Sequence, residues 1–194
     1  GVNKGGTTAL FRYLAAHDEV CASAVKETCY FLPLRYGSAL EPLANYERLF
    51  SHCAHHKLRI ESTPGYLYGG APLAQKIDEQ LPGVQIVVVL RDPVRRFFSF
   101  FHFMKAMQQI DPDIAASSYH TRCRELDLDA LKDPTNNPWF GLEGGNYADY
   151  LEPWVNVFGP RLRIAFFEDL IADPQAFLEA IAKFAGIDPA PFET

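Results

Sequence analysis

The 194-residue chain lacks a long apolar run, a C-x-x-C pair and an N-x-[ST] glycosylation acceptor. A membrane-spanning helix needs about 20 consecutive apolar residues, and none is present. No signal peptide is visible either. The spacing of the cysteines matches neither a C-x-x-C pair nor a set of metal ligands. Cys53 and its neighbour His52 are better explained as residues of a solvated turn than as ligands of a metal site. We therefore expect a cytoplasmic protein without a metal.

Basic charge is also scarce, because the chain has 18 Lys and Arg residues and 24 Asp and Glu residues, which give a net charge of −6. This balance argues against a broad nucleic-acid surface. It also weakens the case for a long polyanionic acceptor, although a basic cleft can lie on an acidic protein. The length fits one compact domain, residues 1–194, with a buried core.

The segment Gly1–Thr8 reads G-V-N-K-G-G-T-T and precedes an amphipathic run. Glycines let successive N–H groups point at an anion, and a following helix adds a favourable dipole. Gly1 and Gly6 have the spacing of a nucleoside-triphosphatase loop, but Thr7 stands where that loop has lysine. Lys4 lies inside the loop instead. We predict an anion site, with an ordinary glycine-rich turn as the alternative. The predicted ligands are Lys4, Gly5, Gly6, Thr7 and Thr8.

A second anion-binding segment follows Val84–Leu90, a continuous apolar run typical of a buried parallel strand. Ligands of open α/β sheets bind beyond the carboxyl ends of strands, where Arg91 is expected. Pro93 suits the first turn of a new helix, on which Arg95 and Ser99 share a face. Arg91 and Ser99 can converge on a second phosphate. The alternative is that Arg91 pairs with Asp92 or caps a neighbour.

The rest of the chain alternates between strand and helix patterns, which implies a parallel sheet with right-handed crossovers. We predict a single P-loop-like α/β domain of three layers, a central parallel sheet flanked by helices, and a strand upstream of Gly1. Residues 108–145 are the least regular and are predicted to form an acceptor-binding or lid insertion. The expected helices are 7–17, 41–52, 72–80, 94–107, 146–158 and 174–185, and the expected strands are 20–25, 58–61, 84–90 and 162–167.

These residues resemble the sulfotransferases that use 3′-phosphoadenosine 5′-phosphosulfate (PAPS), above all the heparan-sulfate-type and related bacterial enzymes. Gly1–Thr8 is similar to their 5′-phosphosulfate loop, and Arg91–Ser99 to their 3′-phosphate motif. The later stretches 145–154 and 167–170 and the closing helix through Ile187 also look like this family. The resemblance covers nearly the whole chain, and its two binding motifs occur in the family's order.

The resemblance implies sulfuryl transfer from PAPS to a hydroxyl or amine, without a metal. Lys4 would stabilise the leaving phosphate. Glu27 matches the family's catalytic glutamate, with a surface ion pair to Lys26 as the alternative. His102, three residues after Ser99 on one helix face, is the competing base, and a structural histidine is its alternative.

The chain departs from the heparan-sulfate-type pattern at Cys29, where those enzymes usually have histidine, and at Ser62, where they have lysine. A C-terminal glycine-rich basic loop is also missing from this sequence. A small molecule, a lipid, a carrier-bound chain and a sugar are all open as acceptors, and the oligomeric state is open too. Two other functions remain: a P-loop kinase or nucleotidase using ATP and magnesium, and a non-catalytic nucleotide-binding module.

Overall fold

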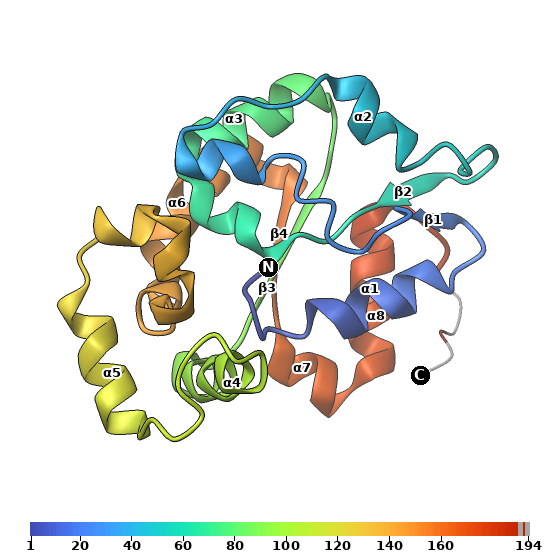
Figure 1. The fold of residues 1–194 in the computed structure, drawn as a ribbon. Helices are drawn as coiled ribbons and strands as arrows, with labels where there is room; N and C mark the ends of the chain where they lie inside the picture. The colour runs from blue at the N-terminus through green and yellow to red at the C-terminus, as the bar shows by residue number, and fades with distance from the viewer. Residues whose placement is uncertain (190–191, 193–194) are drawn as a thin grey trace.

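The computed structural model describes residues 1–189 and Phe192. In these residues four short strands form two parallel pairs, β1 (Val20–Ala22) with β2 (Leu58–Ile60) and β3 (Ile86–Leu90) with β4 (Leu162–Phe166). In the second pair Ile86 lies opposite Leu162 and Leu90 opposite Phe166. The pairing is parallel, as the strand–helix alternation predicts (Figure 1).

Helices cover both faces of the β3–β4 pair. Successive residues of a strand point to opposite faces. Val88 belongs to a core shared with α3 (Gly70–Gln80) and α6 (Tyr147–Phe158), whereas Val89 packs in a second core with helices at both ends of the chain. Those helices are α1 (Thr7–Ala15), α7 (Phe167–Ala172) and α8 (Pro174–Ala185). This burial on both sides explains the continuous apolar run and gives the predicted three-layer α/β architecture (Figure 1).

Several elements differ from the sequence expectations. The helix α2 spans only Leu43–Arg48, and β1 ends three residues earlier than expected. The segment expected to be least regular contains a helix, α5 (Ala116–Glu125), followed by short 3-10 turns at 130–132, 134–139 and 143–145. The helix α4 (Pro93–Ala106) and the last helix agree closely with their patterns, and Gly186 ends the latter with a φ of 72°.

A cavity of about 620 Å³ lies between β2 and β3 and is lined mainly by apolar side chains. Lys4, Arg91 and Ser99 are not among its lining residues. Thr7 is the one predicted anion ligand among its lining residues, so most of the predicted anion site lies outside this cavity. Among the described residues β2 pairs only with β1, and β3 only with β4.

Candidate functional site

The first loop is fixed against the end of β3 by backbone hydrogen bonds. The N–H of Val2 donates to the Val89 carbonyl at 3.0 Å, and the N–H of Gly5 donates back to the Val2 carbonyl at 3.0 Å. Lys4 and Gly6 both have a left-handed backbone, with φ of 67° and 82°. Such a tight reversal directs peptide groups inward, which is the backbone arrangement of an anion-binding loop.

The loop leads directly into α1, and Gly6 is the N-cap residue of this helix. No side chain caps this helix end in the described part of the chain. The first N–H groups of a helix have no partner within the helix. Together with the exposed Thr8 hydroxyl group, they offer donors to an anion beside Lys4.

Arg91 joins the two motifs that the sequence predicted separately. Its Nη1 donates to the Lys4 carbonyl at 3.0 Å, and its guanidinium lies 4.9 Å from the Phe167 ring centre. Its Nε is buried and has no hydrogen-bond partner among the described residues. Asp92 instead accepts from the N–H of Arg95 at 2.7 Å and caps α4. Arg91 thus does not pair with Asp92, and it keeps a free donor that suits a phosphate.

The helix α4 carries the other predicted residues past the end of β3. Ser99 is partly buried, whereas Arg95 and His102 are exposed. No hydrogen bond of the Ser99 hydroxyl group occurs in the described structure. Ser99 is therefore available to a ligand, and His102 lies about one turn further along the helix.

The side chain of Glu27 is 50% exposed and forms an ion pair with Lys26 at 2.7 Å. This contact is the alternative role considered for Glu27, and no contact joins Glu27 to Lys4 among the described residues. The role of Glu27 as a base stays a prediction. The segment around it is well fixed, because the Tyr66 hydroxyl group bonds the Thr28 hydroxyl group at 2.9 Å and accepts from the N–H of Phe31 at 3.2 Å.

Glu61, at the end of β2, is a titratable group that the sequence reasoning missed. Burial raises its pKa to about 7, while hydrogen bonds from Thr63, Tyr66 and Thr28 act in the opposite direction. The Thr63 hydroxyl group donates to its carboxylate at 2.8 Å and accepts from the N–H of Cys29 at 3.3 Å. A polar residue directly after a strand was the available signal. Glu61 thus supports the segment that carries Glu27.

The predicted insertion, residues 108–145, is tied to α4 through a fully buried arginine. Arg96 is 0% exposed, and its Nη2 donates to the Gly141 carbonyl. The Tyr68 hydroxyl group donates to the Gly144 carbonyl at 2.9 Å. Directly after the insertion, the Tyr147 hydroxyl group donates to the Arg91 carbonyl at 2.8 Å. The insertion therefore packs on the helix that carries Ser99, and its role as a lid stays a prediction.

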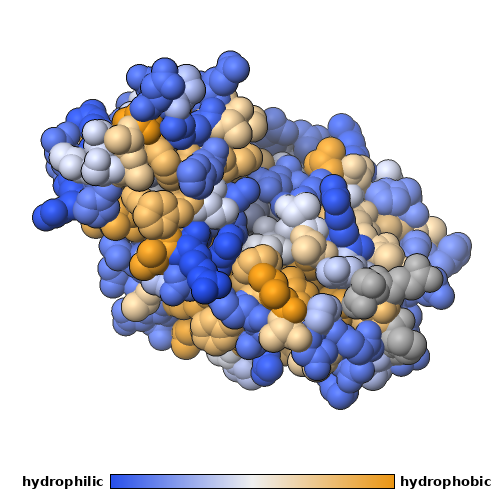
Figure 2. Space-filling view, turned by 90° about the horizontal axis from the view of Figure 1, so that it is seen from below, coloured by the Kyte–Doolittle hydropathy of each residue, from blue (hydrophilic) through white to orange (hydrophobic). Residues whose placement is uncertain are grey.

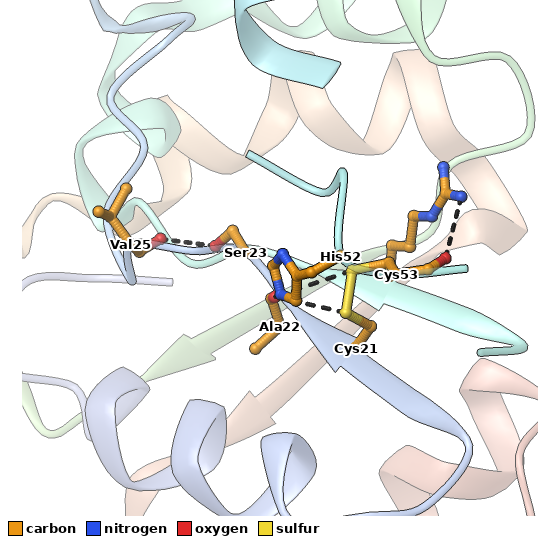
Figure 3. Close-up of a disulfide and its surroundings, with 7 residues drawn as sticks. Cys21, Ala22, Ser23, Val25, His52 and Cys53 are labelled. Carbon is orange, nitrogen blue, oxygen red and sulfur yellow. Dashed lines mark hydrogen bonds between the residues drawn. A yellow bond between two sulfur atoms is a disulfide. The ribbon is translucent and has the colours of Figure 1, made fainter. Parts of the chain in front are cut away.

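Cys21 and Cys53 form a disulfide with a Cα–Cα distance of 5.6 Å, which corrects the expectation of unpaired cysteines (Figure 3). His52 lies beside it and contacts the Ala22 carbonyl at 3.1 Å. One donor atom from each of Cys21, His52 and Cys53 lies within 4.8 Å of the others, but both sulfurs are engaged in the disulfide. Disulfides persist in oxidising compartments, so cysteine spacing no longer supports a reducing one.

Along residues 1–189, no helix combines the length and the apolar composition needed to cross a membrane.

Comparisons with known proteins bear on the family and the fold of this chain. The chain is 29% identical over 189 residues to the heparan sulfate glucosamine 3-O-sulfotransferases 3A1 of mouse and of human. The alignment covers 96% of this chain and 44% of the mouse enzyme, so the chain spans less than half of that relative. A solved sulfotransferase from Alicyclobacillus acidocaldarius has the same fold, with a TM-score of 0.85, 21% identity and coverage of 99% of this chain and 81% of its own.

A second solved structure, the sulfotransferase domain from the curacin biosynthetic pathway, matches with a TM-score of 0.63 and 15% identity over 97% of this chain and 72% of its own. At these identities the two solved structures support the fold alone. The model of the sulfotransferase domain family matches residues 1–193. This match over nearly the whole chain shows that the chain belongs to the sulfotransferase domain family.

Proposed function

We propose that this chain transfers a sulfuryl group from PAPS to a hydroxyl or amine group of an acceptor. The observation that carries the proposal is the hydrogen bond from Arg91 to the Lys4 carbonyl, which joins the two anion-binding motifs into one site. A donor with phosphates at both ends of a nucleoside needs two such motifs at neighbouring strand ends.

The residues of the site divide between the two ends of this donor. Lys4 and the N–H groups of Gly5–Thr8 would hold the phosphosulfate end, where the loop and the start of α1 offer donors. Arg91 and Ser99 would hold the 3′-phosphate. The buried Nε of Arg91, which has no partner among the described residues, fits this role.

The reaction needs positioning and charge stabilisation more than covalent catalysis by the protein. The acceptor oxygen or nitrogen forms a bond to sulfur while the bond from sulfur to the bridging phosphate oxygen breaks. Glu27 takes the proton that the acceptor loses, and His102 is the second candidate for this step. Lys4 neutralises the negative charge that develops on the leaving phosphate. No metal is required in this scheme.

The acceptor is proposed only as a class. The names of the mouse and human relatives refer to heparan sulfate glucosamine, which is their acceptor and not an observation on this chain. A hydroxyl or amine on a small molecule, a lipid, a carrier-bound chain or a sugar satisfies the chemistry. Location in the cytoplasm and the absence of a nucleic-acid partner stay predictions.

Thermal unfolding with 3′-phosphoadenosine 5′-phosphate tests the donor site. At about a hundred times its dissociation constant the bisphosphate is expected to add about 2.7 kcal/mol of stability. AMP, and ATP with magnesium, are expected to add less. Arg91→Ala should abolish the selective effect, whereas Arg122→Ala, which removes an exposed arginine paired with Glu125, should keep it. Stabilisation by ATP with magnesium alone would favour the kinase.

Turnover then separates a catalyst from a binding module. Glu27→Gln is expected to lower kcat by about 10²- to 10⁴-fold and to leave bisphosphate affinity unchanged. Glu79→Gln is the matched control, because Glu79 is also an exposed glutamate paired with a lysine. His102→Ala tests the second candidate base. Tight bisphosphate binding without any sulfuryl transfer would refute the enzyme and leave the binding module.

A further inference from the structure

An aromatic ring lies against the lysine at the centre of the proposed site. The Lys4 Nζ is 4.4 Å from the ring centre of Phe103, within the range of a cation–π contact. In spite of this contact, Phe103 remains 39% exposed. Any group that reaches the sulfuryl end of the donor beside Lys4 therefore passes close to the exposed part of this ring.

The helix α4 changes character along the side that carries Ser99. Arg95, Ser99 and Phe103 follow one another at intervals of four residues, so they lie along one side, and Met107 is the residue directly after the helix. The first two are polar, whereas Phe103 and Met107, 55% exposed, are apolar. Figure 2 shows the face of the molecule that carries α4, where apolar patches lie beside polar surface. The polar half suits the nucleotide, and the apolar half extends beyond Lys4.

Few free cations accompany the apolar half. Lys105 is the one lysine or arginine of α4 after Ser99, and its Nζ donates to the Ile114 carbonyl at 3.3 Å and lies over the Phe101 ring. Lys26, on the segment of Glu27, is paired with that carboxylate. A polyanionic acceptor would need unpaired basic groups to replace its lost hydration.

We propose that Phe103 determines acceptor specificity, and that it selects an alcohol or phenol on an aromatic or aliphatic skeleton over a polyanionic sugar. The proposal rests on the proposed sulfuryl transfer. The ring and Met107 contact the carbon skeleton of the acceptor and remove its apolar surface from water. The acceptor hydroxyl group is thereby held next to Lys4, where the bond to sulfur forms.

A purely positioning role gives a different result. If Phe103 only holds Lys4 in place, the removal of its ring lowers kcat by the same factor for every acceptor. If it contacts the acceptor, its removal raises KM for apolar acceptors and changes kcat less. The two roles are separated by measuring kcat and KM on at least two aryl or alkyl alcohols of different size.

The experiment compares 2-naphthol, 1-octanol and a heparan-type oligosaccharide as acceptors for the wild-type protein, Phe103→Ala and the control Phe98→Ala. Phe98 is a comparably exposed phenylalanine of the same helix, at 45%. We expect transfer to an apolar alcohol and weak or no transfer to the oligosaccharide. We also expect at least a tenfold rise in KM for the alcohol in Phe103→Ala, with Phe98→Ala close to wild type.

Bisphosphate-induced thermal stabilisation is measured on the same variants, and we expect Phe103→Ala to retain it. Three results would overturn the proposal: preference for the oligosaccharide, no transfer to either alcohol, or an equal loss of kcat for all acceptors in Phe103→Ala. Absence of bisphosphate binding by the wild-type protein would instead refute the proposed sulfuryl transfer. Failure of the specificity proposal can thus be told apart from failure of the proposed function.

Discussion

The loop Gly1–Thr8 and the segment that carries Glu27 are held in place by different means. The loop depends on backbone geometry, with left-handed Lys4 and Gly6 and an arginine bonded to the Lys4 carbonyl. The segment 23–31 depends on side chains distant in sequence, namely Glu61, Thr63 and Tyr66, and follows a disulfide-bonded strand.

The contrast predicts that the two regions differ in their sensitivity to substitution. A side chain at Gly6 would add strain to a loop in which Lys4 already carries a side chain at a left-handed position. A segment held by hydroxyl groups and a carboxylate can exchange its partners and keep its path. We therefore expect substitutions at Gly6 to be more damaging than exchanges of the polar partners of segment 23–31.

The largest expected effect on stability comes from the disulfide. Replacement of Cys21 and Cys53 together by serine removes a cross-link between residues 32 positions apart. The chain-entropy relation predicts a loss of about 3–4 kcal/mol in the free energy of unfolding. Urea unfolding measures this loss, and bisphosphate binding should remain under conditions where the variant is folded.

The free Cys29 provides the control, because it is exposed and Cys29→Ser should leave the urea midpoint unchanged. Dithiothreitol should lower the wild-type midpoint towards that of the double variant. Equal wild-type midpoints with and without dithiothreitol would show that the cross-link contributes nothing to stability.

The next largest expected effect on stability comes from Glu61, and this effect depends on pH. Burial raises the pKa of its carboxyl group from 4.5 to about 7, so the folded state binds a proton more tightly than the unfolded state. The resulting stability is fully present below pH 4.5 and is lost as the pH rises through about 7. We expect Glu61→Gln to be more stable than the wild-type protein at pH 8, by on the order of 3 kcal/mol.

The difference between wild type and Glu61→Gln, measured by urea unfolding from pH 4.5 to 8, isolates this one group because the other titrating groups are common to both proteins. Glutamine still accepts from the Thr63 hydroxyl group, so the path of the Glu27 segment should persist. A difference that does not change with pH would contradict the buried, proton-binding state of Glu61.

The sequence offers a donor-site hypothesis because the residues of each proposed motif are close together in the chain, and this site stays a prediction. The spacing of residues within Gly1–Thr8 and within Arg91–Ser99 follows local rules for loops, helix starts and strand ends. The continuous apolar pattern of Val84–Leu90 indicates a strand that is buried on two faces. The family match and the fold comparison confirm the α/β sulfotransferase architecture that these segments predict.

The missed features all depend on contacts between distant parts of the chain. The disulfide joins β1 to the turn after α2, and the burial of Glu61 arises where 26–31 packs over the end of β2. The helix α5 is weakly amphipathic, and its burial rests on Tyr119 and Cys123 packing against α4. Neither spacing nor local propensity reports such contacts.

The loop Gly1–Thr8 yields the sharpest matched pair of substitutions, and the difference in stability between the two variants is the smallest expected effect. Gly6 and Gly83 have nearly the same φ, 82° and 81°. A Cβ at Gly6 would meet the Phe167 ring at 2.2 Å, whereas a Cβ at Gly83 has nothing within 4 Å. Gly83→Ala should therefore cost only the strain of a left-handed alanine, about 1–2 kcal/mol.

Gly6→Ala should cost the same strain and a further 1–3 kcal/mol, roughly, for displacing the ring. Because Phe167 also stacks on the Arg91 guanidinium, its displacement should weaken bisphosphate binding, which Gly83→Ala should leave intact. Urea unfolding and bisphosphate titration of the two variants measure both effects. Equal stabilities and equal affinities would mean that the loop is not held by its backbone and its packing on Phe167, and the contrast between the two ends of the site would fail.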